Sequence, residues 1–322
     1  MASLLSVENL QVQFQTKKGI NTAVDGVSFS VEKGRILGIV GESGCGKSVT
    51  SMSILQLLGS NARISGGSIK LDGKELIGLP EKEMCRIRGN DIAMIFQDPM
   101  TALNPTLTIG TQLMEPIMLH QNCGKKEAWT RAVDVLKRVG IAAPEKRMKE
   151  YPHQLSGGMR QRVMIAMAVS CEPRLLIADE PTTALDVTIQ AQILELMCEL
   201  REKMGTAIML ITHDMGVVAE TADDVLVLYA GKAVEYGSIE DIFERPKHPY
   251  TQGLLNSIPR LDEDVELLNT IEGTVPAPDA MPAGCRFAPR CPYGKDRCMK
   301  ENPGVYHAGN SLVSCFRYEG EK

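Results

Sequence analysis

A short run near the start of the chain has the residue types and spacing of a loop that binds phosphate. It fits G-x-x-x-x-G-K-[S/T] between an apolar run and a periodic segment. The glycines would let backbone N–H groups face an anion, Lys47 would bridge the β- and γ-phosphates of a nucleotide, and the Ser48 hydroxyl would ligate Mg²⁺. A glycine-rich turn that matches by chance is the alternative. The candidate residues are Gly41, Glu42, Ser43, Gly44, Cys45, Gly46, Lys47 and Ser48.

The thiol in this run carries an expectation of its own. Cys45 would lie close to a helix N-terminus, where positive potential favours the thiolate form. We therefore expect a reactive thiol at Cys45, whose alkylation blocks phosphate entry and which bound MgATP protects.

Two neighbouring carboxylates follow a second apolar run. Asp179 and Glu180 end the sequence Leu-Leu-Ile-Ala-Asp-Glu, which begins at Leu175. A parallel strand would deliver both to the carboxyl edge of its sheet, where open α/β folds bind ligands. Asp179 then suits the Mg²⁺ shell, and Glu180 suits the base that polarises an attacking water. A solvated acidic strand end is the alternative.

Four cysteines are concentrated in the last part of the chain, with the spacing C-x5-C-x6-C-x16-C. Disulfides are disfavoured in a reducing compartment. Structural zinc usually shows a C-x2-4-C pair, which is absent here, so zinc stays possible and is not favoured. The local basic excess suits an anionic iron–sulfur cluster, and unligated thiols are the remaining alternative. The four residues are Cys285, Cys291, Cys298 and Cys315.

The apolar pattern predicts the elements that would position these groups. Buried strands are expected at 36–40, 175–178, 207–211 and 225–229, and half-buried antiparallel strands at 10–14 and 27–31. The stripe from Thr188 to Met204 predicts a core-facing helix that Gly205 ends. Residues 100–172 are expected to be mostly helical. After about residue 240, prolines interrupt every potential helix, which predicts an appendage held by something other than a large core.

Composition narrows the class of protein. The chain has 322 residues, 43% of them hydrophobic, and a formal net charge of -5. No polycationic surface is available, so nucleic acid is not an expected partner. No apolar stretch reaches the roughly 18–20 residues of a membrane span. We expect a cytosolic chain that docks on a membrane protein.

At this point the motifs resemble those of ATP-binding cassette proteins. Leu155-Ser156-Gly157-Gly158-Met159 resembles the family signature, although most members carry glutamine where Met159 stands. The resemblance implies a P-loop α/β fold with antiparallel β and helical subdomains. It also implies a Q-loop at Gln97 that serves catalysis and Mg²⁺, a D-loop at 184–186 that ends in Asp186, a switch histidine at His213 and an adenine-stacking ring at Phe14. Two cassettes would bind head to tail, each ATP lying between one phosphate loop and the partner's Ser156, Gly157 and Gly158.

A second resemblance covers nearly the whole chain. The segments 96–105, 151–159 and 248–251 are similar to those of dipeptide and oligopeptide importer ATPases, and the tail is most similar to the dipeptide-permease D-type subunit. This resemblance implies a [4Fe-4S] cluster on the four cysteines and a paralogous second ATPase as dimer partner. It further implies two permease subunits, an extracytoplasmic peptide-binding protein and a place at the cytoplasmic face of the membrane. The expected domains are 1–240, with a helical subdomain at about 98–172, and 241–322.

Other functions share some of these motifs. Nickel and antimicrobial-peptide transporters have much of the pattern. DNA-repair ATPases insert long coiled coils between the phosphate loop and the signature, for which the segment from Ser48 to Leu155 is too short. Translation-associated proteins carry two cassettes in one chain, whereas this sequence has one. A peptide-import ATPase is therefore the predicted function.

Overall fold

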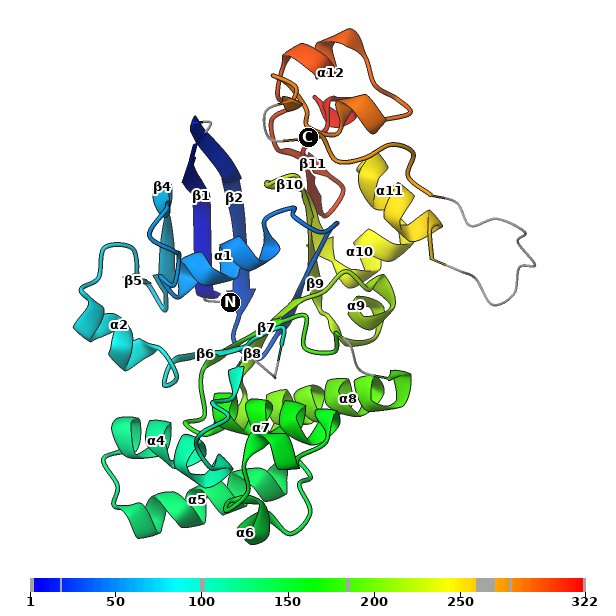
Figure 1. The fold of residues 1–322 in the computed structure, drawn as a ribbon. Coiled ribbons are helices and arrows are strands. Elements are labelled where there is room, and N and C mark those ends of the chain that lie inside the picture. The colour runs from blue at the N-terminus through cyan, green and yellow to red at the C-terminus, as the bar shows by residue number, and fades with distance from the viewer. Residues whose placement is uncertain are drawn as a thin grey trace.

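The computed structural model describes residues 3–17, 19–98, 102–183, 186–258, 270–277 and 280–320. Two sheets and a group of helices make up the fold (Figure 1). The smaller sheet has the order β2-β1-β4-β5 and is antiparallel. Its strands are β1 (Ser3–Thr16), β2 (Gly19–Glu32), β4 (Ala62–Leu71) and β5 (Lys74–Glu75).

The larger sheet has the order β11-β12-β10-β9-β3-β8-β7-β6. The run from β9 to β6 is parallel, and β10, β12 and β11 are added antiparallel at one side. The α/β class and the strands expected from the apolar runs are therefore confirmed. The strands are β3 (Ile36–Val40), β6 (Ile92–Ile95), β7 (Leu175–Asp179), β8 (Ala207–Ile211), β9 (Asp224–Tyr229), β10 (Lys232–Ser238), β11 (Tyr306–Ala308) and β12 (Ser311–Val313).

Alternate residues of the central strands belong to two different cores. On β3, Ile36 and Val40 pack with the helices, whereas Leu37 and Ile39 pack between the two sheets. Such strands are buried on both faces, which explains why their sequences are continuous apolar runs. The first core uses α7 (Gly157–Val169), α8 (Val187–Met204) and α9 (Met215–Thr221), and the second covers α1 (Lys47–Ile54).

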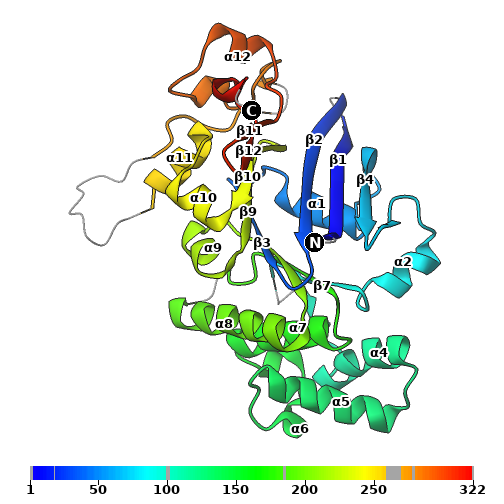
Figure 2. The same ribbon diagram turned by 180° about the vertical axis from the view of Figure 1, so that it is seen from behind.

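The remaining helices lie at the ends of the molecule. In Figures 1 and 2, α4, α5 and α6 gather beside α7, away from the antiparallel sheet. This helical region agrees with the expectation for residues 100–172. The helices are α2 (Glu81–Ile87), α4 (Ile109–Gln121), α5 (Lys125–Arg138), α6 (Pro144–Arg147), α10 (Ile239–Glu244), α11 (Pro249–Asn256) and α12 (Asp296–Lys300), with short 3₁₀ turns at Pro152–Gln154, Ala288–Arg290 and Phe316–Tyr318. Among the described residues no helix combines the length and apolar character that crossing a bilayer needs.

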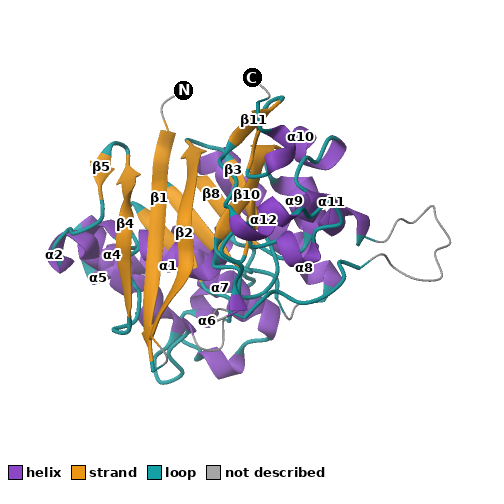
Figure 3. Ribbon diagram, turned by 90° about the horizontal axis from the view of Figure 1, so that it is seen from above, coloured by secondary structure: helices purple, strands orange, loops and turns teal. Residues whose placement is uncertain are grey.

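The tail is joined to the main sheet. β12 pairs with β10, Glu235 lying opposite Val313, and Phe287 is buried in the same core as Tyr229 and Tyr250. β12 lies between β10 and the edge strand β11, and Figure 3 shows α12 near this side of the sheet. The expectation that prolines break every helix after residue 240 is wrong for α11, because Pro249 stands at its first turn, where a missing N–H costs nothing. The domain division at residue 240 stays a prediction.

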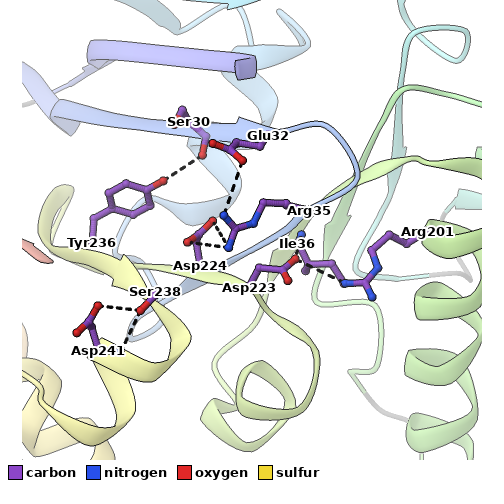
Figure 4. A network of polar contacts seen from close by, with 10 residues as sticks. All are labelled: Ser30, Glu32, Arg35, Ile36, Arg201, Asp223, Asp224, Tyr236, Ser238 and Asp241. Carbon is purple, nitrogen blue, oxygen red and sulfur yellow. Dashed lines mark hydrogen bonds and ion pairs between the residues drawn. The ribbon is translucent and has the colours of Figure 1, made fainter. Parts of the chain in front are cut away.

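A polar network holds the start of β3 (Figure 4). The Asp223 carboxylate accepts the Ile36 N–H at 2.7 Å and lies 3.6 Å from Arg201 Nη1. Arg35 pairs with Asp224 at 3.4 Å and with Glu32 at 3.7 Å. Burial raises the pKa of Asp224, and Arg35 partly opposes this shift. These contacts fix one end of β3, so that its other end presents the loop at 41–48.

Candidate nucleotide site

The loop from Gly41 to Ser48 connects β3 to α1 and needs glycine at particular positions. Gly41 has a φ of +153°, and a Cβ there would lie 2.1 Å from the Leu228 carbonyl oxygen. Gly46 has a φ of +100°, and its Cβ would lie 2.9 Å from the Ala23 carbonyl oxygen. Side chains at these positions would clash with the backbone, so the glycines let the loop close tightly against β9 and β2. The predicted strand, loop and helix order is confirmed.

The cation of the loop is Lys47, which is only 6% exposed. Its Nζ donates to the carbonyl oxygens of Gly41 at 2.7 Å and Glu42 at 3.2 Å. The ammonium group therefore lies within the loop, where phosphate oxygens can replace these carbonyls as acceptors. An ammonium with movable donors is suited to phosphate.

Cys45 does not have the environment that we expected from its position. Its side chain is 1% exposed. Burial raises the pKa of the Cys45 thiol, and the smaller effects of Lys47 and of backbone N–H groups do not offset the burial. The expectation of a reactive thiolate is wrong, because the sulfur faces the core beneath the loop, and its surroundings disfavour the charged form.

Asp179 ends β7 and hydrogen-bonds with Ser48 at the start of α1. Burial raises its pKa, which the bond from Ser48 and the charge of Lys47 partly counter. Within the described residues, its Oδ1 is buried with no hydrogen-bond partner. A carboxylate oxygen left without a donor beside a hydroxyl suits a hard cation, so Asp179 and Ser48 fit the expected Mg²⁺.

The three residues that we expected to serve catalysis lie together, because Gln97 and His213 both contact Glu180. Gln97 Nε2 donates to Glu180 Oε2 at 2.7 Å, and His213 Nδ1 lies 3.3 Å from Glu180 Oε1. Thr183 Oγ1 also donates to Oε2, at 3.0 Å. Glu180 is 17% exposed and His213 is 65% exposed, so a water can reach the carboxylate from the His213 side. Sequence reasoning missed Thr183, because no motif marks a hydroxyl that supports a carboxylate three residues earlier.

The signature residues occupy a different place. Ser156 caps α7 and accepts the Met159 N–H at 3.4 Å, and Asp186 caps α8 and accepts the Ile189 N–H at 3.0 Å. Ser156, Gly157, Gly158 and Asp186 all line one cavity of about 540 Å³. Figures 1 and 2 both place α7 apart from α1. Ala184 and Leu185 of the expected D-loop lie outside the described residues.

Phe14 lies on β1 and is half-buried against the core between the sheets. It is opposite Asn21 on β2 and Ala62 on β4. A role in stacking on adenine stays a prediction for this residue.

The four late cysteines line a single cavity of about 70 Å³, together with His248 and Phe287. All four are free thiols. The pKa of Cys285 is raised to about 11, mainly by burial and to a smaller extent by the neighbouring Cys315 and Cys291. In the described segments no group of three or more His, Cys, Asp or Glu side chains is arranged to hold a metal ion. The four cysteines thus line one cavity, and within the described segments they form no compact ion site.

Comparison with protein families gives two matches along the chain. Residues 24–183 match the ABC transporter family, and residues 234–298 match the family described as oligopeptide/dipeptide transporter, C-terminal region. The first match contains the loop at 41–48 and Glu180. The second contains Cys285, Cys291 and Cys298.

Curated relatives are similar over almost their whole length. The oligopeptide transport ATP-binding protein AppD of Bacillus subtilis is 56% identical, with 100% of this chain and 98% of the relative covered. The oligopeptide transport ATP-binding protein OppD of Escherichia coli is 52% identical, covering 98% and 93%. The dipeptide transport ATP-binding protein DppD of Bacillus subtilis is 54% identical, covering 98% and 95%.

Solved structures share the fold. The ATP-binding cassette MJ0796, in a dimeric post-hydrolysis state bound to ADP and Pi, has a TM-score of 0.66 at 27% identity, with 73% of this chain and 98% of that chain covered. CbiO1 from Clostridium perfringens has a TM-score of 0.64 at 27% identity, covering 76% and 92%. The phosphate loop, the carboxylate pair and these similarities together show that the chain belongs to the ABC transporter family, among the ATP-binding proteins of oligopeptide and dipeptide transport.

Proposed function

We propose that this chain is the ATP-hydrolysing subunit that powers the import of dipeptides or oligopeptides through separate permease subunits. The observation that carries the proposal is the convergence of Gln97 and His213 on Glu180, whose neighbour Asp179 hydrogen-bonds with Ser48 of the phosphate loop. The names of relatives at 50–56% identity support peptides as the transported class. No spanning helix is present among the described residues, so the membrane part of such a transporter would be other chains at whose cytoplasmic face this one docks.

The side chains divide the work of hydrolysis. The loop N–H groups and Lys47 bind the phosphates, and Ser48 and Asp179, with Gln97, would hold Mg²⁺, which neutralises phosphate charge when bound. Glu180 accepts hydrogen bonds from Gln97 and Thr183 and can orient a water for attack on the γ-phosphorus. The water proton passes towards Glu180, and the bond between the γ-phosphorus and the bridging oxygen breaks to give ADP and phosphate. His213 holds the same carboxylate from the exposed side.

The separation of the signature from the loop supports a composite site between two ATPase subunits. Ser156, Gly157 and Gly158 line a cavity that does not include the phosphate loop. A second, paralogous ATPase would place its own signature against the ATP bound at the loop 41–48. The signature of this chain would in turn contact the ATP bound to the phosphate loop of that second subunit. The dimeric state of the MJ0796 cassette supports a head-to-tail pair.

For the four cysteines we propose ligation of a [4Fe-4S] cluster. A tetrahedral zinc site with Zn–S bonds of about 2.3 Å needs sulfurs about 3.8 Å apart, and the described residues contain no such compact group. A cluster takes one thiolate on each of four irons, so its ligands can stand farther apart than those of zinc, and all four cysteines line one cavity. When bound, a cluster can store an electron and cross-link the segment. Cys285, Cys291, Cys298 and Cys315 would hold it.

Reconstitution tests the transport function. The full-length chain is purified from membranes together with its permease subunits, which mass spectrometry identifies, and the complex is placed in proteoliposomes. We expect ATP hydrolysis to rise when the peptide-binding protein carries a dipeptide or oligopeptide. Stimulation by Ni²⁺ and not by peptides would assign the complex to nickel transport instead.

A further inference from the structure

Two arginines, each adjacent in sequence to a proposed cluster ligand, contact the nucleotide side of the molecule. Arg290 precedes Cys291, and its side chain is only 6% exposed. Its Nη1 donates to both carboxylate oxygens of Glu42, at 2.9 Å and 3.1 Å. Glu42 is the second residue of the phosphate loop. The loop therefore has an ion pair with a residue nearly 250 positions later in the chain.

The guanidinium of Arg290 is held on every side. Nε donates to the Glu272 carbonyl at 3.0 Å, Nη2 donates to the Ile271 carbonyl at 3.2 Å, and Nη1 lies 3.4 Å from Tyr229 Oη. A guanidinium with this many acceptors has a fixed position. It therefore holds the Glu42 carboxylate at a defined place next to the segment that contains Cys291.

Glu42 in turn is tied to the phosphate-binding atoms. Its N–H donates to Tyr250 Oη at 2.9 Å, and its carbonyl oxygen accepts from Lys47 Nζ at 3.2 Å. A continuous series of contacts runs from Cys291 through Arg290 and Glu42 to Lys47.

A second, independent connection starts at Cys285. The next residue, Arg286, donates to the Ala230 carbonyl and pairs with Asp25 at 2.7 Å. The following Gly231 donates its N–H to the Cys45 carbonyl at 2.9 Å. Arg290 thus contacts the phosphate loop directly at Glu42, whereas Arg286 contacts Ala230, whose neighbour Gly231 contacts the loop at Cys45.

The charge of Glu42 determines how this arrangement affects the affinity for nucleotide. A carboxylate in a loop that binds three phosphates opposes the ligand by Coulomb repulsion, and the effect is larger where water is partly excluded. Arg290 neutralises that carboxylate. Without Arg290, the negative charge of Glu42 would be left uncompensated in the phosphate loop and would weaken nucleotide binding.

We propose that Arg290 is a positioning residue of the phosphate loop, through which the four-cysteine segment controls the affinity for MgATP. The inference rests on the proposed function only for the identity of the metal group on the cysteines. The ion pair itself belongs to this chain and needs no metal to be tested.

The first experiment measures the dissociation constant of a fluorescent ATP analogue with Mg²⁺ on the full-length chain. Arg290→Met should weaken binding about tenfold, and Arg290→Lys should fall between it and the unmodified protein. In a Glu42→Gln background, Arg290→Met should change the dissociation constant little further, because no carboxylate is left to neutralise. Arg297→Met is the matched control: Arg297 also precedes a cysteine and pairs with Glu301 and Glu319, away from the loop.

The second experiment removes iron by anaerobic chelation and repeats the binding measurement. The unmodified protein should lose affinity, whereas Glu42→Gln should not respond. In the assembled transporter, Arg290→Met should have a higher KM for MgATP than the unmodified protein. Its kcat should change less, because Glu180 is untouched.

Equal affinities for Arg290→Met and Arg297→Met would overturn the proposal, and so would an equal response of Glu42→Gln and unmodified protein to chelation. Iron content is measured for every sample. If the purified chain holds no iron but Arg290→Met still weakens binding in a Glu42-dependent way, the positioning role stands and only the cluster assignment fails. If Arg290→Met itself loses the metal, Glu42→Gln, which leaves the tail unchanged, decides the outcome.

Discussion

Glu180 adopts a backbone conformation that most residues avoid. Its φ is +47°, in the left-handed region, directly after a buried strand. Such a conformation costs about 1–2 kcal/mol and persists where surrounding contacts hold it. Here the N–H donates to the Ile211 carbonyl at 2.9 Å, and the side chain meets Gln97 and His213. These contacts hold Glu180 in this conformation, with its carboxylate against Gln97 and His213.

Replacing Glu180 with Gln should separate binding from turnover. The amide keeps the size of the side chain but cannot take a proton from water, so ATP hydrolysis by the complex should fall more than about 100-fold. The phosphate loop is untouched, so the dissociation constant for MgATP should stay within about twofold. Hydrolysis at the unmodified rate would show that Glu180 is not the base.

Cys45 should react slowly with maleimide in the native protein. The thiol is buried and its pKa is raised by burial, so both access and the thiolate fraction are low. Exposed Cys85 is the internal reference. Mass spectrometry of timed samples should find Cys85 modified first. Modification of both at one rate would mean that the loop opens readily without nucleotide.

The residue types of the site could be predicted from sequence to a large extent. The spacing from Gly41 to Ser48 fixes a loop, and the pair Asp179 and Glu180 follows an apolar run, so local pattern was sufficient. No local sequence pattern indicates the roles of Arg290 and Thr183. The partner of Arg290 is far away in the chain, and a pairing of that kind depends on the completed fold.

At the scale of elements, the phosphate loop shows how strictly a connection can be specified. Gly41 and Gly44 both have positive φ, but only Gly41 faces backbone, because a Cβ on Gly44 would meet nothing within 4 Å. Replacement by alanine therefore tests the cost of backbone strain alone at Gly44, and the cost of strain together with a steric clash at Gly41.

Gly44→Ala should destabilise the protein by about 1–2 kcal/mol, the cost of a left-handed alanine. Gly41→Ala adds a clash with the Leu228 carbonyl and should cost about 3 kcal/mol or more. Thermal unfolding of both variants without nucleotide measures the difference. Equal unfolding temperatures would show that the loop moves away from β9 at no cost.

Element prediction succeeded where runs were long and failed where they were short. The five-residue apolar strands β3 and β8 and the long helix α8 have clear patterns. By contrast, β11 and β12 have three residues each, too few to show a period. These two strands exist because β10 offers a row of backbone groups to pair with, which is a property of the sheet and not of their own sequence.

For the whole molecule, the four cysteines should act as one structural unit. Changing Cys291 to Ser should abolish the broad visible absorbance of a cluster and remove iron, because an incomplete ligand set exposes the irons. Residues 270–320 should then be cleaved faster by protease, since few residues of the tail are buried in the main core. Cys198→Ser, outside the cavity, is the control. Zinc in place of iron in anaerobically purified protein would refute the cluster.

The pairing of β12 with β10 has a consequence for how the chain reaches its folded state. Until residues 311–313 emerge from the ribosome, β10 is an edge strand, although every nucleotide motif has already been synthesised. An unprotected edge can recruit a strand from a neighbouring chain. A chain that stops before residue 306 therefore has an open sheet edge, and the synthesis of residues 306–313 is the step that protects this sheet against aggregation.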